Sequence, residues 1–224
     1  MATGRVVVHL ARVLGEGKLG DPASDPVSAT DLQALLAPRF LDRALELLPG
    51  DAVDVIGYAS TTTAYAIGFE AEAAVVSSLA GRAGRPVAAT CASAVSALHV
   101  LGVERVALVG APWFDPDFNR LGARYFSSQG FEVVSSTSAQ LSHDPQRIEP
   151  AAVYEWTSRH VGDDAEAVFI GGNAFRAVAA IARLEAALAR PVLTSNQVLL
   201  WNLLALTGAS LPVKGYGRLF VRSP

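Results

Sequence analysis

Short apolar segments rich in valine and isoleucine recur along the chain, and most are followed by a longer amphipathic stretch. Short continuous apolar runs of this kind are typical of strands that are buried on both faces of a parallel sheet. The pattern predicts strands at Val6–Leu10, Val53–Tyr58, Val87–Thr90, Val106–Val109, Val133–Ser135, Val168–Ile170 and Val192–Thr194.

The stretches between these strands are rich in alanine and leucine and have helical spacing. They predict helices at Asp31–Leu48, Thr63–Ala80, Ala92–Leu101, Pro116–Gln129, Pro150–His160, Ala174–Leu188 and Gln197–Thr207. Gly102, Gly130 and Gly208 directly follow three of them, as expected where a helix ends in the left-handed conformation. Strands that alternate with helices predict an α/β fold with parallel sheets.

The chain also contains two copies of one pattern. "VDVIGYAST" leads through a helix to "GRPVAATCAS", and "AVFIGGNAF" leads through a helix to "ARPVLTSNQ". The duplication predicts two similar parallel-sheet lobes that face each other across a cleft. Residues 1–103 and 208–224 are assigned to the first lobe, and residues 104–207 to the second. The Gly/Pro/Asp-rich loop at residues 14–28 is either a lid over this cleft or a plain surface loop.

Each copy ends its strands in turns of small residues. In the register of the repeat, Ser60–Thr61 corresponds to Gly172–Asn173, and Thr90–Cys91 corresponds to Thr194–Ser195. Parallel α/β units bind ligands at the carboxyl ends of their strands, and helix starts offer unpaired N–H groups that favour anions. We therefore expect the four turns to line one anion-binding cleft. The alternative is that they are ordinary connections without a ligand.

Composition excludes several classes of protein. The chain of 224 residues is 51% hydrophobic and 17% charged, with a net charge of −3 and no cluster of lysine and arginine. We therefore expect a folded chain rather than a disordered one, with no nucleic-acid partner and no membrane-spanning segment. One cysteine and four scattered histidines exclude an internal disulfide and a cysteine-rich metal site. Without a recognisable export signal, a cytoplasmic location is expected.

Longer motifs in the second half resemble a known family. "GVERVALVGAPWFDPDFNRLGARYFSSQGFEVV", "LEAALARPVLTSNQVLLWNLLALTG" and the ending "GYGRLF" are similar to segments of the aspartate/glutamate racemase superfamily. The similarity is greatest to the branch that holds arylmalonate decarboxylase and maleate cis-trans isomerase, and it covers roughly residues 50–220. It implies a two-lobed fold, no cofactor, and chemistry on a carbon acid beside a carboxylate.

Members of this family use one or two cysteines, and the chain has neither of them. The first cysteine position falls on Ser60, and the second falls on Gly172, or on Gly171 if the turn shifts by one residue. Two-thiol racemisation is therefore excluded, as is decarboxylation by a cysteine at the second position.

What the resemblance leaves in place is a pocket of hydroxyl and backbone donors that stabilises enolate-like charge. The position of the family's tyrosine falls on Trp113 or Pro112. The predicted substrate-binding residues are Thr61, Thr62, Trp113, Gly172, Asn173 and Ala174.

Three residues are candidates to replace the missing thiols. Cys91 lies at a predicted helix start, where the pKa of a thiol can fall; the alternative is a small buried core residue. Ser60 would need a base brought close by the fold. His9 ends the first predicted strand and could face the cleft as a base; the alternative is an ordinary core or surface histidine. Glu70 and Glu72 follow the first turn on a helix and are expected to face solvent.

The sequence thus predicts a cofactor-independent lyase or isomerase, decarboxylase-like, that acts on a small carboxylic acid with a proton donor other than the family cysteines. Two alternatives stay open: a carboxylate-binding protein without turnover, and an enzyme of a specialised pathway that performs a cyclisation, dehydration or hydrolysis. Whether the chain forms a homo-oligomer also stays open.

Overall fold

The computed structural model describes residues 6–13, 28–209 and 213–221, and it has the predicted α/β class. All paired strands are parallel and form two sheets, one of two strands and one in the order β4-β3-β5-β6. The loop predicted at residues 14–28 lies almost entirely outside the described residues. The strands are β1 (Ile56–Tyr58), β2 (Val87–Ala89), β3 (Arg105–Gly110), β4 (Glu132–Ser138), β5 (Ala167–Ile170) and β6 (Val192–Thr194).

Helices connect these strands, mostly where the pattern predicts them. Two predicted helices are each broken in two: Pro38 begins a new helix, and Gly68, with φ of 81°, separates the next pair. The helices are α1 (Ala29–Ala34), α2 (Pro38–Glu46), α3 (Thr61–Ile67), α4 (Phe69–Ala83), α5 (Thr90–Leu101), α6 (Pro116–Ser127), α7 (Pro150–His160), α8 (Ile181–Leu188) and α9 (Ser195–Leu206).

Four short 3₁₀ helices complete the described elements. They are η1 (Gly50–Ala52), η2 (Pro145–Arg147), η3 (Val178–Ala180) and η4 (Arg218–Val221). Within the described part of the chain, no helix is long and apolar enough to cross a membrane.

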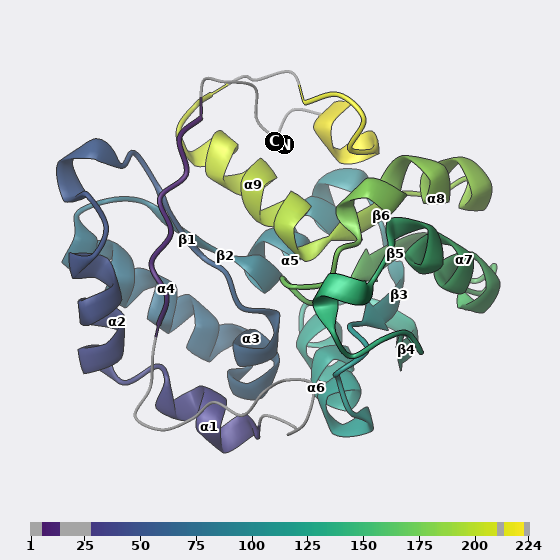
Figure 1. The fold of residues 1–224 in the computed structure, drawn as a ribbon, viewed down its shortest axis with the longest axis horizontal. Helices are drawn as coiled ribbons and strands as arrows, with labels where there is room; N and C mark the ends of the chain where they lie inside the picture. The colour runs from purple at the N-terminus through teal and green to yellow at the C-terminus, as the bar shows by residue number, and fades with distance from the viewer. Residues whose placement is uncertain (1–5, 14–27, 210–212, 222–224) are drawn as a thin grey trace.

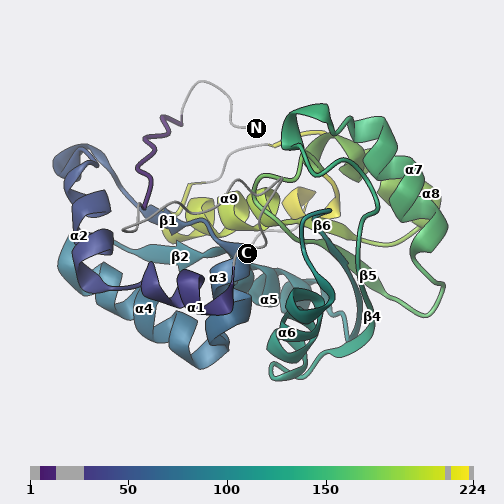
Figure 2. The ribbon, with the colours of Figure 1, turned by 60° about the horizontal axis from the view of Figure 1, so that its bottom comes forward.

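Helix α9 connects the two sheets. It continues directly from β6 of the larger sheet, but it packs against α5 and against both strands of the smaller sheet (Figure 1). Helix α3 of the smaller sheet packs in turn against α6, which lies on β3 and β4 of the larger sheet (Figure 2). The carboxyl ends of strands from both sheets are thereby held near one another. The assignment of residues to two lobes stays a prediction.

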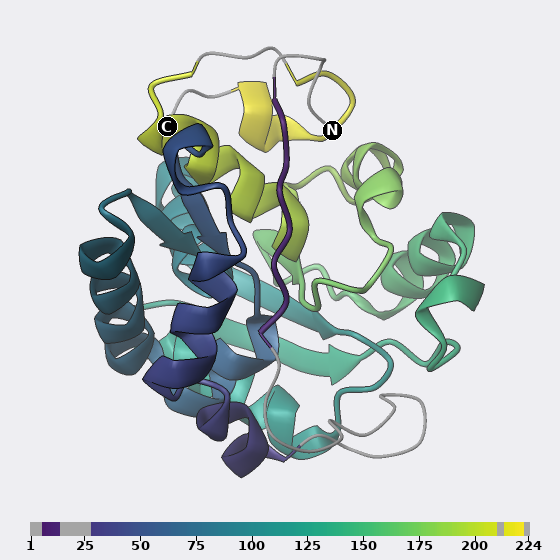
Figure 3. The same cartoon turned by 60° about the vertical axis from the view of Figure 1, so that its left-hand side comes forward.

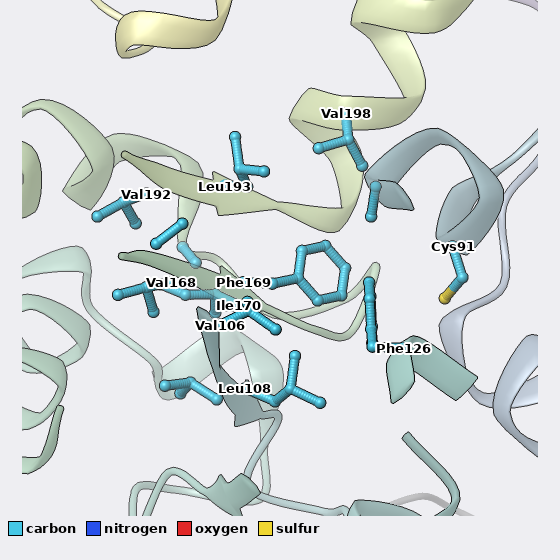
Figure 4. Packing of buried hydrophobic residues seen from close by; sticks show 14 of the residues in the cluster. Cys91, Val106, Leu108, Phe126, Val168, Phe169, Ile170, Val192, Leu193 and Val198 are labelled. Atoms are coloured by element: carbon cyan, nitrogen blue, oxygen red, sulfur yellow. The ribbon is translucent and has the colours of Figure 1, made fainter. Parts of the chain in front are cut away.

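The main hydrophobic core surrounds the larger sheet. Strand β5 is buried at every position, as its continuous apolar run predicts. Figure 4 shows Val168, Phe169 and Ile170 packed between residues of the neighbouring strands, with Phe126 of α6 beside them and Cys91 of α5 at the edge of the group. A smaller cluster, centred on Leu41, Leu79 and Val87, supports the two-stranded sheet.

The predicted strand Val6–Leu10 is not formed. The segment is extended but belongs to neither sheet, and the side chains of Val7, Val8 and Leu10 are 75–84% exposed. Figure 3 shows it as a purple segment separate from the strand arrows. Its apolar composition resembled that of the buried strands, but without hydrogen-bonded neighbours in a sheet it has no face to bury.

Candidate functional site

The first predicted turn begins a helix, as expected. Ser60 caps α3: its Oγ accepts the Thr63 N–H at 3.2 Å and donates to Thr63 Oγ1 at 2.7 Å. These are the usual contacts of an N-cap serine, whose hydroxyl accepts a hydrogen bond from a backbone N–H that has no partner within the helix. The half-buried Ser60 hydroxyl has no base among these partners, so they do not activate it as a nucleophile.

The second turn does not begin a helix, and the prediction of a helix over Ala174–Leu188 is wrong in its first half. Helix α8 starts only at Ile181, after the short helix η3. Gly172 has φ of +112°, and a Cβ placed there would lie 2.8 Å from the Cβ of Ala111. The backbone therefore turns away at a position that only glycine fits, and this turn contributes single N–H groups rather than a helix terminus.

Residues far apart in sequence meet between the two turns. The Thr61 N–H and the Thr61 hydroxyl both donate to Asn173 Oδ1 at 3.1 Å. Thr61 Oγ1 also lies 2.9 Å from Ser195 Oγ, and the Gly172 N–H donates to Ser195 Oγ at 2.9 Å. The predicted approach of the two turns therefore occurs in the structure. We call Thr61, Gly172, Asn173 and Ser195 the polar cluster.

The number of hydroxyl protons fixes the direction of donation in the hydrogen bonds of the polar cluster. The Thr61 hydroxyl has one proton, which goes to Asn173 Oδ1. Ser195 must then donate to Thr61 Oγ1, while it accepts from the Gly172 N–H. The result is a chain of donors that runs from Gly172 through Ser195 and Thr61 to one acceptor. Such chains polarise cooperatively, so the acceptor position favours an electron-rich oxygen.

The amide nitrogen of Asn173 faces two further helix starts. It donates to Thr90 Oγ1 at 3.3 Å and to Asn196 Oδ1 at 3.1 Å, and Asn196 Nδ2 donates back to the Asn173 carbonyl oxygen at 2.8 Å. Thr61, Thr90 and Ser195 are the first residues of α3, α5 and α9. The Asn173 side chain is thus held by the starts of three helices.

The other residues predicted to bind substrate lie around this cluster with fewer contacts. Thr62 is half-buried, and Ala174 is exposed. Trp113 is half-buried and packs edge-on against Phe114 and Phe175, with ring centroids 6.5 and 6.3 Å apart. These ring contacts fit the packing role that a tryptophan has at the edge of a core.

Of the other two catalytic candidates, His9 is not in a strand as predicted, whereas Cys91 lies at a helix start as predicted. His9 is exposed in the segment that forms no strand. Cys91 is fully buried, and its thiol donates to the Thr61 carbonyl oxygen at 3.9 Å. Burial, with a smaller effect of the nearby Glu72 carboxylate, raises the pKa of the Cys91 thiol well above its usual value. The expected fall of this pKa is wrong, because loss of solvent outweighs the helix start.

Glu72 is the ionisable residue whose position the sequence predicts wrongly. Glu70 is exposed as expected, but Glu72 is fully buried and accepts a hydrogen bond from the Tyr125 hydroxyl. Burial raises the pKa of Glu72 to about 7, against the lowering effects of Tyr125 and of the Ala92 and Cys91 backbone N–H groups. The sequence predicts one continuous helix over Thr63–Ala80, whereas the structure has a break at Gly68. The burial of Glu72 is therefore not evident from the helical pattern.

Sequence reasoning placed the Thr194–Ser195 turn in the cleft but did not name Ser195 as a site residue, and it omitted Asn196. The signal was present: both follow the repeated Arg-Pro-Val strand at the start of a helix. In the described residues, no group of three or more histidine, cysteine, aspartate or glutamate side chains could hold a metal ion.

Fold and site together define an α/β protein with a hydrogen-bonded polar cluster between the turns of two parallel sheets. Comparison with known proteins gives the family. A family model described as arylmalonate decarboxylase matches residues 39–220, and the chain belongs to this family.

A curated relative is similar over much of the chain. Maleate isomerase of Pseudomonas putida KT2440 is 29% identical over 170 residues, which cover 69% of this chain and 64% of that protein. The chain therefore matches less than two thirds of the length of this relative.

Solved structures share the fold. The maleate isomerase Iso of Pseudomonas putida strain S16 has a TM-score of 0.78 at 22% identity, covering 88% of this chain and 82% of that chain. A crystal structure of arylmalonate decarboxylase has a TM-score of 0.72 at 21% identity, covering 85% of this chain and 82% of that chain.

Proposed function

We propose that this protein is a cofactor-independent lyase or isomerase that acts on a small carboxylic acid. The polar cluster holds the acid and stabilises the enolate-like charge that forms when a bond at the α-carbon breaks. The relatives support the class: one is a maleate isomerase, another an arylmalonate decarboxylase, and a solved variant of the Pseudomonas putida S16 maleate isomerase contains maleate.

One observation carries the proposal, and it is the position of the Asn173 amide. A planar carboxamide has the shape of a carboxylate, and its Oδ1 already receives the N–H and the hydroxyl of Thr61. The side chain acts as an internal ligand at the end of the donor chain. A carboxylate in the same place would accept the same donors more strongly, because hydrogen bonds to an ionised acceptor are about twice as strong as neutral ones. Substrate would bind by displacing Asn173.

The reaction needs charge stabilisation more than it needs a strong base. In the decarboxylation of a malonate, the bond between the α-carbon and the departing carboxylate breaks, and carbon dioxide leaves. The electron pair of that bond stays on the α-carbon and is delocalised into the remaining carboxylate, which gives an enediolate. A single well-placed donor to such an oxyanion is worth about 10²–10³ in rate, and Thr61 contributes two donors. A separate group then protonates the α-carbon. We assign this step to Ser60 or Cys91, which flank Thr61, in preference to the exposed His9.

The test compares two substitutions of one residue. Thr61→Ala removes the hydroxyl at the end of the donor chain and should weaken binding of maleate or phenylmalonate about 10–100-fold. Thr61→Ser keeps the hydroxyl and should stay close to the wild type. Titration calorimetry measures both. Equal affinity of Thr61→Ala and wild type for every acid that binds would overturn the proposed site.

The alternative function, carboxylate binding without turnover, is favoured by a different observation. The four members of the polar cluster bond to one another through hydroxyls, amides and backbone N–H groups, none of them ionisable. The Cys91 thiol, which donates to the Thr61 carbonyl oxygen, is fully buried. Exchange of α-hydrogen for deuterium in D₂O, or carbon dioxide release from phenylmalonate, separates the two. An enzyme shows exchange or release that Thr61→Ala abolishes, whereas a binding protein shows neither while it still binds the acid.

A further inference from the structure

A cavity of about 460 Å³ lies beside the polar cluster. Asn173 and Asn196 line it, and the same two residues hold one another at the helix starts described above. Asn173 therefore belongs both to the cavity wall and to the cluster. The volume is in the range of small-molecule pockets, roughly 300–1,000 Å³. Since the Asn173 amide occupies the acceptor position of the polar cluster, displacement of this side chain would expose that position to the cavity.

The cavity wall carries an unbalanced positive charge. Its lining includes Arg176 and Lys214 but no aspartate or glutamate, in a protein whose net charge is −3. Elsewhere in the described residues, arginines such as Arg105 and Arg190 form ion pairs with carboxylates. Arg176 instead makes a 3.4 Å contact with the Gln146 carbonyl oxygen. Arg176 and Lys214 line the same concavity, and within the described part of the chain neither forms an ion pair with a carboxylate. Cationic side chains around a concavity raise the local concentration of anions.

The segment that contributes Lys214 is firmly attached. The Tyr216 carbonyl oxygen accepts a hydrogen bond from the Gln197 side chain, and the Arg218 N–H donates to both oxygens of the buried Glu185 at 3.1 and 2.9 Å. Leu219 is fully buried. Lys214 thus lies two residues before a stretch that is hydrogen-bonded and packed onto the fold.

The rest of the lining is largely apolar. Phe175, Val178 and Tyr216 lie in the wall together with small alanine, glycine and proline residues. Small-molecule sites typically combine such a surface with a few polar groups that fix the orientation of the ligand.

We propose that this cavity binds a second, remote anionic group of the substrate, a carboxylate or phosphate carried at the end of an apolar segment. The inference rests on the proposed function: the reacting carboxylate takes the place of the Asn173 amide, the apolar segment lies along Phe175 and Tyr216, and the remote anion binds Arg176 and Lys214. The substrate is then longer than a four-carbon acid.

The test measures affinity against ligand length and charge. Titration calorimetry compares octanedioate with octanoate, which has the same chain but lacks the second charge, and includes butanedioate as a short diacid. Wild type should bind octanedioate at least about tenfold more tightly than octanoate, since a charged hydrogen-bonded contact is worth about 1.5–3 kcal/mol. Butanedioate should show no such advantage over butanoate. A phosphate-terminated octanoate distinguishes the two possible remote groups.

Variants locate the effect. The double substitution Arg176→Ala, Lys214→Ala should abolish the advantage of octanedioate and leave octanoate affinity unchanged; Lys214→Arg, alone, should retain the advantage. Arg43→Ala, an exposed arginine on α2, is the matched control. An equal loss for both ligands in the double variant, or no advantage in wild type, overturns the inference. If the proposed role of the polar cluster is wrong, the result is different: Thr61→Ala then binds octanoate and maleate as tightly as wild type does.

Discussion

The two turns of the sequence repeat begin alike and end differently. Both follow a short apolar strand, β1 or β5, and both present small residues. The first turn begins α3 at once, with Ser60 as its cap. The second passes through Gly172 at φ of +112° into a loop that delays α8 until Ile181.

This difference determines what each turn contributes to the site. A turn that begins a helix contributes donors, here the N–H and hydroxyl of Thr61. A turn that leaves the helical path can direct a side chain toward the other turn, and Asn173 extends from it as an acceptor. Similar sequences thus give complementary halves of one hydrogen-bonded cluster. The deciding feature is a glycine conformation, which the pattern of apolar residues does not reveal.

The largest effect should come from adding one methyl group to the second turn. Gly172→Ala places a Cβ 2.8 Å from that of Ala111 and forces an L-residue to φ of +112°. Overpacking and backbone strain each cost about 1–3 kcal/mol, so we expect about 4 kcal/mol of destabilisation. Urea unfolding followed by circular dichroism measures it.

The neighbouring glycine supplies the matched control. A Cβ at Gly171 would lie 3.3 Å from Tyr65 Oη and 3.4 Å from Thr61 Cγ2, at an ordinary φ. Gly171→Ala should therefore cost less than about 1.5 kcal/mol. Similar losses for both variants would show that the second turn does not depend on the conformation of Gly172.

A second prediction concerns the buried carboxyl group behind the first turn. The pKa of Glu72 rises from 4.5 to about 7 in the folded protein, so between these values the folded state binds more protons than the unfolded state. Stability should fall as the pH rises from 4.5 to 7, by about 3 kcal/mol from this group, and should change little above that range. Unfolding free energies measured across pH check this.

Glu72→Gln should remove most of this fall. The titratable groups that interact with Glu72 include Tyr125 from α6, Cys91 from α5, Tyr65 from α3 and Tyr58 from β1, and burial raises the pKa of each of them. They stay neutral between pH 4.5 and 7, so they do not compete for the effect. An unchanged slope in the Glu72→Gln protein would assign the pH dependence to other residues.

The smallest expected effect tests the cap of the first turn. Ser60→Ala removes the acceptor of the Thr63 N–H and should destabilise the protein by about 1 kcal/mol. Ser60→Asp keeps an acceptor at the cap and should recover most of that loss. Thermal unfolding of the three proteins orders them. A Ser60→Ala variant that is as stable as wild type would mean that α3 is held by packing alone.

The apolar pattern by itself determined much of this protein. It predicted the parallel α/β class and located six of the strands, because a strand buried on both faces must be apolar along its length. The repeat predicted that the turns at Ser60–Thr61 and Gly172–Asn173 would lie near one another, and in the structure Thr61 and Asn173 are hydrogen-bonded. The small residues of the turns indicated a site without naming its chemistry.

Tertiary structure decided what local sequence could not. Val6–Leu10 has the composition of a strand but finds no partner, because pairing depends on distant segments. Whether Glu72 is buried depends on the break at Gly68 and on Tyr125 of α6, and the pKa of Cys91 follows from the solvent that its neighbours exclude. The polar cluster exists because hydrogen-bond direction is set by where whole elements lie, and no single segment of sequence contains that information.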